Sequence, residues 1–178
     1  MDDIYERLLV LRCQTGDASA FSELLSRYDG RIRGFLGRLL NGTGAVDDVA
    51  QDIWLDVFRT VGGLRDAGAF RAWLYRIARD RAFRLLRRRR TPRPVTVAPD
   101  VVEQVVDDQD SGPYADEVLL LQAALVRLPP EQHEVIWLRV VEGFSYEQIA
   151  RTVGCELGTV RSRLHYAKRA LRDQFTKD

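Results

Sequence analysis

The sequence predicts an all-α protein in which two small helical domains are joined by a flexible acidic linker, with a helix-turn-helix in the C-terminal domain. Leu, Ala and Arg, which favour helices, dominate its 178 residues, and only 9% of them are aromatic. Apolar residues recur every three or four positions from Asp17 to Arg90 and again after Tyr114. Between these blocks, prolines and a polar DDQDSG run interrupt the pattern. We therefore expect domains at residues 1–90 and 114–178, with the linker at residues 91–113.

Three helices are expected in the N-terminal block from Asp17 onwards. Asp17 is a suitable N-cap for the first, and the turn residues Asn41–Gly44 end it. The second is expected at Val46–Val61, before Gly62–Gly63, and the third at Ala69–Arg90. Helical spacing predicts that the inner faces of the second and third helices carry Val49, Ile53, Val57, Phe58, Phe70, Trp73, Leu74, Ile77, Ala78 and Leu85.

The C-terminal block contains the signals of a helix-turn-helix. After a helical pattern at residues 119–128, Pro129-Pro130 begins a new helix, which stops at Gly143. Ser145, with Gln148 three residues later, forms a capping box for the next helix. Gly154 suits the sharp turn that follows because a positive φ costs glycine little.

The last predicted helix has an apolar and a polar face. Val160, Leu164, Ala167 and Leu171 share the side that packs on the preceding helix, where the small Ala150 allows a close crossing. The polar face carries arginines, a hydroxyl and two polar-tipped rings: Arg161, Ser162, His165, Tyr166 and Arg169. These groups suit base edges and phosphates in a DNA major groove. The alternative is a solvated basic helix in an unrelated bundle.

The net charge of +1 conceals a strong pattern along the chain. Residues 1–90 hold 17 arginines and no lysine against 12 acids, whereas residues 91–118 hold one arginine against seven acids. Residues 119–178 hold nine basic groups against seven acidic ones. Two basic blocks separated by an acidic strip indicate two modules that face nucleic acid.

Other classes of protein are disfavoured by what the sequence lacks. No apolar run is long enough to cross a bilayer, and Met1-Asp2-Asp3 is acidic where a signal peptide is basic, so we expect a cytoplasmic protein without membrane insertion. Cys13 and Cys155 lie far apart, with no histidine at metal-ligand spacing. We expect no metal, no cofactor and no catalytic residues, and hence no enzyme.

The segment Phe70–Arg90 interleaves aromatic residues with arginines, as single-stranded DNA requires. The arginines supply charge for the backbone, and the rings offer surfaces on which unpaired bases stack. The residues concerned are Trp73, Tyr75, Arg76, Arg79, Arg81, Phe83 and Arg84. The alternative is that Trp73 and Phe83 belong to the core and that the run of four arginines at its end is solvated.

An acidic stripe runs along the second helix at spacings of three and four residues. It consists of Asp48, Gln51, Asp52 and Asp56. Such a stripe beside basic helices does not face DNA, so it faces either solvent or a basic protein surface. Composition alone favours solvent.

Taken together in order and spacing, these segments resemble the extracytoplasmic-function group of bacterial sigma-70 family RNA polymerase sigma factors. The matching segments are GDASAF, DDVAQDIWLDVF, FRAWLYRIARDRAFRLLRRRR, LPPEQHEVIWLRVVEGFSYEQIA and GTVRSRLHYAKRAL. The resemblance implies a non-catalytic transcription initiation factor that binds core RNA polymerase, recognises the −35 and −10 elements of promoter DNA and helps to melt the duplex. It also implies a monomer when free, held by an anti-sigma factor.

The resemblance carries site residues over by position. The −35 element is assigned to Thr159, Arg161, Ser162, His165, Tyr166 and Arg169. The −10 element and its melting are assigned to Arg65, Phe70, Trp73, Arg76, Arg79, Asp80, Phe83 and Arg84. Binding to the clamp helices of the largest polymerase subunit is assigned to Asp48, Gln51, Asp52 and Asp56, which reverses the preference for solvent. The family also binds the flap of the second-largest subunit, and the acidic linker matches the segment that threads toward the RNA exit path.

The chain departs from the family pattern at three positions. Asp80 stands where asparagine is usual, and a carboxylate accepts hydrogen bonds but donates none, so base preference there differs. Glu156 replaces a usual proline, and Tyr166 a usual arginine. Two other interpretations stay open: a helix-turn-helix transcriptional regulator that works without polymerase, and a degenerate sigma-like adaptor.

Overall fold

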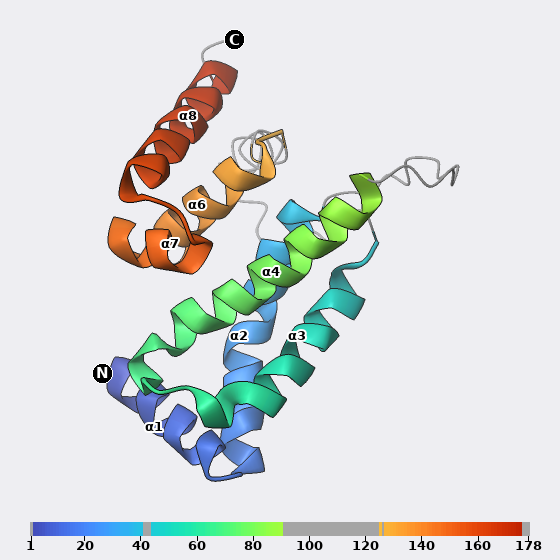
Figure 1. Ribbon diagram of the computed structural model, residues 1–178, viewed down its shortest axis with the longest axis vertical. Helices are drawn as coiled ribbons and strands as arrows, with labels where there is room; N and C mark the ends of the chain where they lie inside the picture. Colours follow the sequence, from blue (N-terminus) through green and yellow to red (C-terminus); the bar gives the residue numbers. More distant parts are fainter. Residues whose placement is uncertain (1, 41–43, 91–124, 126, 176–178) are drawn as a thin grey trace, which may run out of the picture.

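The structure is a computed structural model that describes residues 2–40, 44–90, 125 and 127–175. Within those ranges it is helical and contains no strand, which confirms the expected fold class (Figure 1). The helices are α1 (Asp2–Gln14), α2 (Ala18–Leu39), α3 (Val46–Thr60), α4 (Phe70–Arg90), α6 (Pro130–Val140), α7 (Tyr146–Val153) and α8 (Leu157–Phe175). The linker expected at residues 91–113 and the helical pattern expected at residues 119–124 lie outside the described residues. No described helix is long and apolar enough to cross a bilayer.

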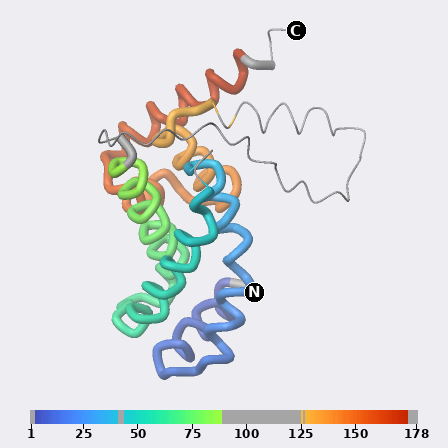
Figure 2. The backbone as a smooth tube through the Cα atoms, turned by 90° about the vertical axis from the view of Figure 1, so that its right-hand side faces the viewer, coloured from blue at the N-terminus to red at the C-terminus, as the bar shows by residue number. Residues whose placement is uncertain are grey.

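Helix α2 is the central element of the N-terminal half, with α1, α3 and α4 packed around it (Figures 1 and 2). The carboxylate of Asp17 caps α2 by accepting hydrogen bonds from the backbone amides of Ser19 and Ala20, which confirms the predicted N-cap. The buried face of α2 repeats every three or four residues and consists of Ala20, Leu24, Tyr28, Ile32, Phe35, Leu36 and Leu39. Burial of this continuous stripe holds the four helices together.

One inward position was predicted wrongly. Phe58 in α3 is 62% exposed, whereas Ile53 and Val57 are fully buried. One residue beyond Val57 is a rotation of about 100° around the helix, which takes Phe58 off the buried face. Its ring packs edge-on against Phe21 at 5.2 Å between ring centroids, at the margin of the core.

The C-terminal half folds as a helix-turn-helix preceded by α6. Pro130 begins α6, and Ser145 and Gln148 form the predicted capping box at the start of α7. Gly154 ends α7 in the left-handed conformation, with φ of 68°, which a side chain would oppose. Val160 in α8 is fully buried, so the helix packs through the face that the sequence indicated.

The two halves pack directly against each other, which the sequence did not predict. α6 lies on α2, and α7 lies on α4 (Figure 1). Trp137 of α6 covers Gly34 of α2, where an added Cβ would stand 2.9 Å from Cη2 of the indole. The absence of a side chain at Gly34 therefore allows the close approach of the two halves.

His133 of α6 is buried at this contact, 1% exposed, beside Trp137. Neither ring nitrogen has a hydrogen-bond partner among the described residues. Burial lowers the pKa of His133 from 6.5 to about 4, and the charge of Arg38 acts in the same direction. The imidazole is therefore neutral at pH 7.

Acidification should destabilise the protein through His133. Between pH 6.5 and pH 4 the unfolded chain binds a proton at this position that the folded chain does not. Above pH 6.5 the neutral, buried ring makes its full contribution to the free energy of unfolding, and this contribution is lost as the pH falls toward 4. From pH 7 to pH 4, urea unfolding should show the wild type losing about 3 kcal/mol more than His133→Leu. Parallel pH profiles for the two proteins would contradict this.

Candidate nucleic-acid interface

The polar face of α8 lies in solvent, as the sequence predicted. Arg161, Ser162, His165, Tyr166 and Arg169 are all exposed, and Thr159 is half-buried. Beneath them Val160, Leu164 and Ala167 are buried and fix the rotation of the helix. The six residues that were assigned to the −35 element therefore lie on one side of α8, and this side faces solvent.

The helix-turn-helix is held in shape by local hydrogen bonds. The Ser145 hydroxyl accepts from the Gln148 backbone amide at 3.2 Å, and the Gln148 side chain accepts from the Ser145 amide at 2.7 Å. At the other end of α7, the amides of Gly154 and Cys155 both donate to the carbonyl of Ala150, at 2.9 and 3.1 Å. Both ends of α7 are thus satisfied, so α8 leaves the turn in a fixed direction.

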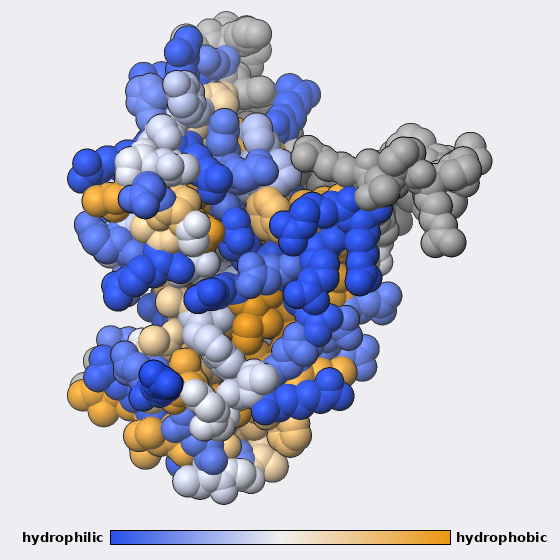
Figure 3. All heavy atoms as spheres, viewed as in Figure 1, coloured by the Kyte–Doolittle hydropathy of each residue, from blue (hydrophilic) through white to orange (hydrophobic). Residues whose placement is uncertain are grey.

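The α4 residues assigned to the −10 element fall into two groups: some are exposed, and others contact the rest of the protein. Arg76, Asp80 and Arg84 are exposed, as is Arg65 in the preceding loop, and Trp73 and Phe83 are half-buried. Hydrophilic side chains gather over the C-terminal half of α4 (Figure 3). This surface has the charge and the partly exposed rings that a single strand requires.

Phe70, which the resemblance assigned to the −10 element, lies in the core, as helical spacing predicted. It is fully buried, with its ring 5.7 Å from that of Tyr28 and 6.0 Å from that of Trp73. Helical spacing aligns Phe70 with Leu74 and Ala78, which are also fully buried. The neighbouring Trp73 is the ring at this end of α4 that keeps some exposure.

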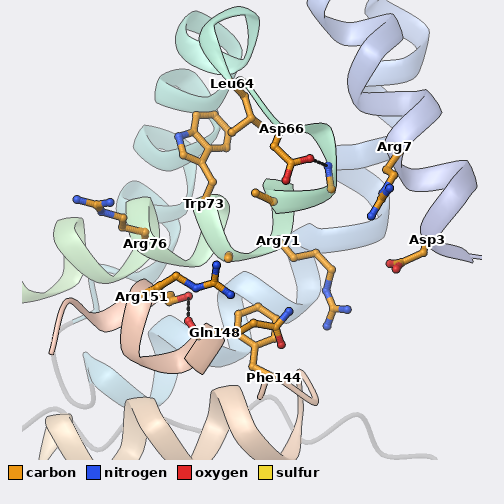
Figure 4. Close-up of a pocket in the computed structure, with 14 residues that line it drawn as sticks. Asp3, Arg7, Leu64, Asp66, Arg71, Trp73, Arg76, Phe144, Gln148 and Arg151 are labelled. Atoms are coloured by element: carbon orange, nitrogen blue, oxygen red, sulfur yellow. Dashed lines mark hydrogen bonds between the residues drawn. The ribbon is translucent and has the colours of Figure 1, made fainter. Parts of the chain in front are cut away.

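A pocket of about 490 Å³ lies between the start of α4 and α7 (Figure 4). Arg71, Trp73 and Arg76 of α4 line one side, and Gln148 and Arg151 of α7 line the other. The loop before α4 completes the wall with Leu64 and Asp66, and Arg7 reaches in from α1. Four arginines outnumber the two aspartates of the lining, Asp3 and Asp66, so this pocket is electropositive.

The acidic stripe on α3 is only partly open to a partner. Asp48 and Gln51 are exposed. Asp52 is exposed as well, but Arg81 of α4 donates to it through Nη1 at 3.1 Å and to Asp56 through Nε at 2.8 Å. Part of the stripe therefore faces a basic residue of the same chain, and Arg81 belongs with this stripe rather than with the surface for DNA.

Two buried carboxylates at the contact between the halves were missed by the sequence reasoning. Glu134 of α6 is 0% exposed and accepts from Nε of Arg79 at 2.7 Å and Nη1 of Arg163 at 3.1 Å. Burial raises the pKa of Glu134 to about 7, although both arginines act against that change. The signal in the sequence is an acid inside the apolar HEVIWL run, which helical spacing places on a buried face.

The second of these carboxylates is Glu142, whose side chain is also fully buried. It accepts from the Tyr75 hydroxyl at 2.6 Å and from Nε of Arg31 at 3.1 Å, and it pairs with Arg71 at 3.3 Å. Burial and the bond to Glu142 raise the pKa of Tyr75 well above its usual value, so the phenol stays protonated and donates.

The described ranges hold no group of three His, Cys, Asp or Glu side chains placed to bind an ion. Cys13 is buried and Cys155 is half-buried, and both are free thiols. Burial raises the pKa of the Cys13 thiol, which keeps it in its unreactive form.

The Sigma-70 region 2 family matches residues 24–91 of this chain, and the Sigma-70, region 4 family matches residues 119–171. The chain is 35% identical to the RNA polymerase sigma-H factor of Pseudomonas aeruginosa over 176 residues, which cover 93% of this chain and 91% of that protein. It is 32% identical to the ECF RNA polymerase sigma-E factor of Haemophilus influenzae over 189 residues, which cover 98% and 97%.

Two solved structures have similar folds. CnrH, in complex with the cytosolic domain of CnrY, matches with a TM-score of 0.69 at 23% identity, covering 97% of this chain and 98% of that one. The sigma factor RpoE of Bartonella quintana, in complex with the anti-sigma factor NepR, matches with a TM-score of 0.66 at 25% identity, covering 89% and 98%.

Removing the cap of α7 should loosen the helix-turn-helix. Ser145→Ala deletes the hydroxyl that accepts from the Gln148 amide, and loss of such a cap costs about 1 kcal/mol of unfolding free energy. Urea unfolding measures this directly. Ser22→Ala is the matched control, because the Ser22 hydroxyl only bonds to a carbonyl within α2 and its loss costs less than about 0.5 kcal/mol. Equal losses in the two variants would contradict the role given to Ser145.

Proposed function

Because this chain belongs to the extracytoplasmic-function group of sigma-70 family RNA polymerase sigma factors, we propose that it directs core RNA polymerase to specific promoters by recognising their −35 and −10 elements. The observation that carries the proposal is the presence of region 2 and region 4 in one chain, in that order. The protein acts as an initiation factor, and the chemistry of transcription stays with the polymerase.

The −35 element is read by the exposed face of α8. Arg161, Ser162, His165 and Tyr166 supply donors and acceptors for base edges and phosphates, with Arg169 one turn further along the helix. The caps of α7 support this role, because a backbone that is already fixed loses little conformational entropy on binding.

The −10 element is opened at α4 and the loop before it. Unstacking a base costs a few kcal/mol, and stacking on a ring recovers about 1–3 kcal/mol per base. Trp73 is the ring that we assign to this role. The DNA backbone is contacted by Arg65, Arg76 and Arg84, with Asp80 and Phe83 beside them. Asp80 is exposed, so its carboxylate is available to accept from a base amino group.

Core polymerase binds at the outward face of α3. Asp48 and Gln51 are exposed there, and Leu55 and Phe58 on the same helix are 46% and 62% exposed. Exposed apolar residues beside acids are typical of a protein interface. An anti-sigma factor is the further partner that we propose, since RpoE of Bartonella quintana was solved with one.

Run-off transcription on fragmented genomic DNA tests the proposal, using purified core RNA polymerase with and without this protein. Discrete transcripts that require the protein are expected, and their start sites give the promoter sequence. Binding to core without any transcripts would indicate a sigma-like adaptor. Tight binding to duplex DNA with no effect on polymerase would indicate an independent regulator.

Two substitutions should separate promoter recognition from polymerase binding. Arg161→Ala removes a groove-facing cation and should weaken binding of the holoenzyme to −35 DNA by about 1–3 kcal/mol, with affinity for core unchanged. Asp48→Arg reverses an exposed charge on α3 and should weaken binding to core by about tenfold. Each variant is the control for the other, in titrations of labelled protein with core and of holoenzyme with promoter DNA. Equal effects on both steps would refute this division of roles.

A further inference from the structure

Asp80 is an acid on a strongly basic helix. The sequence of α4, FRAWLYRIARDRAFRLLRRRR, contains nine arginines and this one carboxylate. Asp80 is exposed, and the exposed Arg76 and Arg84 lie about 6 Å along the helix axis on either side of it. A carboxylate repels the phosphates that these arginines attract. Contact with the DNA backbone therefore does not account for Asp80.

The contacts of Asp80 within the protein do not account for it either. Its Oδ1 lies 3.3 Å from Nη1 of Arg79, and its side chain is 52% exposed, so this pair contributes little to stability. Arg79 has other partners: its Nε donates to the buried Glu134 at 2.7 Å, and its guanidinium lies 4.8 Å from the centroid of the Phe83 ring. Arg79 is thus held without Asp80, and the carboxylate of Asp80 is open to a ligand.

The chemistry of a carboxylate determines which base it favours. It accepts hydrogen bonds through two adjacent oxygens and donates none, so its best partner presents two adjacent donors. The Watson–Crick edge of guanine presents such a pair, N1–H and the N2 amino group. Adenine and cytosine present one amino group beside a ring nitrogen that accepts, and thymine presents N3–H between two carbonyl oxygens. A carboxylate is repelled by those acceptors, so guanine is the base that it favours.

We propose that Asp80 makes α4 select an unpaired guanine, whose N1–H and N2 amino group donate to the two carboxylate oxygens. The proposal rests on the proposed function for single-stranded DNA at α4 and adds the identity of one base. In a duplex this edge of guanine is paired with cytosine, so the selection acts on the opened strand. Asp80 disfavours any strand that places a phosphate or another base opposite it, and thereby lowers affinity while raising selectivity.

The guanine at Asp80 and the base that stacks on Trp73 are different nucleotides. Trp73 lies seven residues before Asp80, which places both on nearly the same side of α4. Their separation along the helix axis is about 10 Å, whereas stacked bases follow one another at about 3.4 Å. The guanine preference therefore belongs to one position of the strand, and stacking on Trp73 does not determine it.

Asp80→Asn tests the proposal, because an amide has nearly the same shape but replaces one acceptor with a donor. The amide matches adenine or cytosine, each of which presents one donor beside one acceptor, and it no longer matches the two donors of guanine. Asp173→Asn is the matched control. Asp173 lies on α8, and its side chain is 63% exposed, so this change removes the same charge from a different helix.

Selection from a randomised single-stranded DNA library gives the first readout, with the full-length protein used alone and in complex with core RNA polymerase. The retained strands should contain one position at which the wild type and Asp173→Asn favour guanine by about 5- to 150-fold. Asp80→Asn should favour adenine or cytosine there, and it should bind strands without guanine no more weakly than the wild type does. A wild type that selects another base or none, or a guanine preference that persists in Asp80→Asn, would overturn the proposal.

Guanine analogues in the selected strand give the second readout and need no variant. Hypoxanthine lacks the N2 amino group, so it should weaken binding of the wild type by about tenfold. 7-Deazaguanine keeps both donors of the Watson–Crick edge and should bind as guanine does. Equal binding of the guanine and hypoxanthine strands would contradict the contact with Asp80.

These results are distinguishable from a failure of the proposed function. If run-off transcription fails while the protein alone still selects guanine through Asp80, the role in initiation is wrong and the base preference stands. Transcripts that require the protein, but whose −10 strands share no guanine, would leave the proposed function in place and overturn the role of Asp80.

Discussion

The position of α6 depends on one constraint: the carboxylates of Glu134 and Glu142 have left water and must be paired. An ionised carboxylate without partners in an apolar setting is strongly destabilised, and α6 packs where arginines reach both groups. Helices α2, α4 and α8 provide them. Because α7 and α8 are joined to α6 through tightly capped turns, fixing α6 also fixes the direction in which the polar face of α8 points.

Arginine is suited to this arrangement because its planar guanidinium binds carboxylates and phosphates with the same geometry. The N-terminal block uses 17 arginines and no lysine, and the structure divides them among distinct tasks. Arg81 neutralises Asp52 and Asp56, and Arg79 pairs with Glu134, whereas Arg76 stays exposed. A basic composition therefore indicates an anionic ligand but cannot say which arginines remain available to it.

The sequence predicted the local structure well because local structure has local signals. Asp17, Ser145 with Gln148, and Gly154 act at the helix ends where their chemistry placed them. The contact between the halves was not predicted, because Arg31 and Glu142 lie 111 residues apart and no periodicity links them. Phe58 was misjudged for a related reason: an aromatic residue near the edge of a helical stripe suits the core and the surface equally. The exposed face of α8 was predicted, but which of its side chains contact bases stays a prediction.

The contact between the halves combines apolar packing of Trp137 with ion pairs, and these two kinds of contact respond differently to a polyanion. Separating apolar faces exposes surface that water solvates poorly, and nothing in DNA replaces the lost contact. The arginines differ in this respect, because a phosphate offers a guanidinium such as that of Arg79 or Arg71 the same geometry of contact as the carboxylates of Glu134 and Glu142. Glu134 therefore occupies a position on α6 where helical spacing alone would favour an apolar residue, and it is stable there because Arg79 of α4 and Arg163 of α8 pair with it.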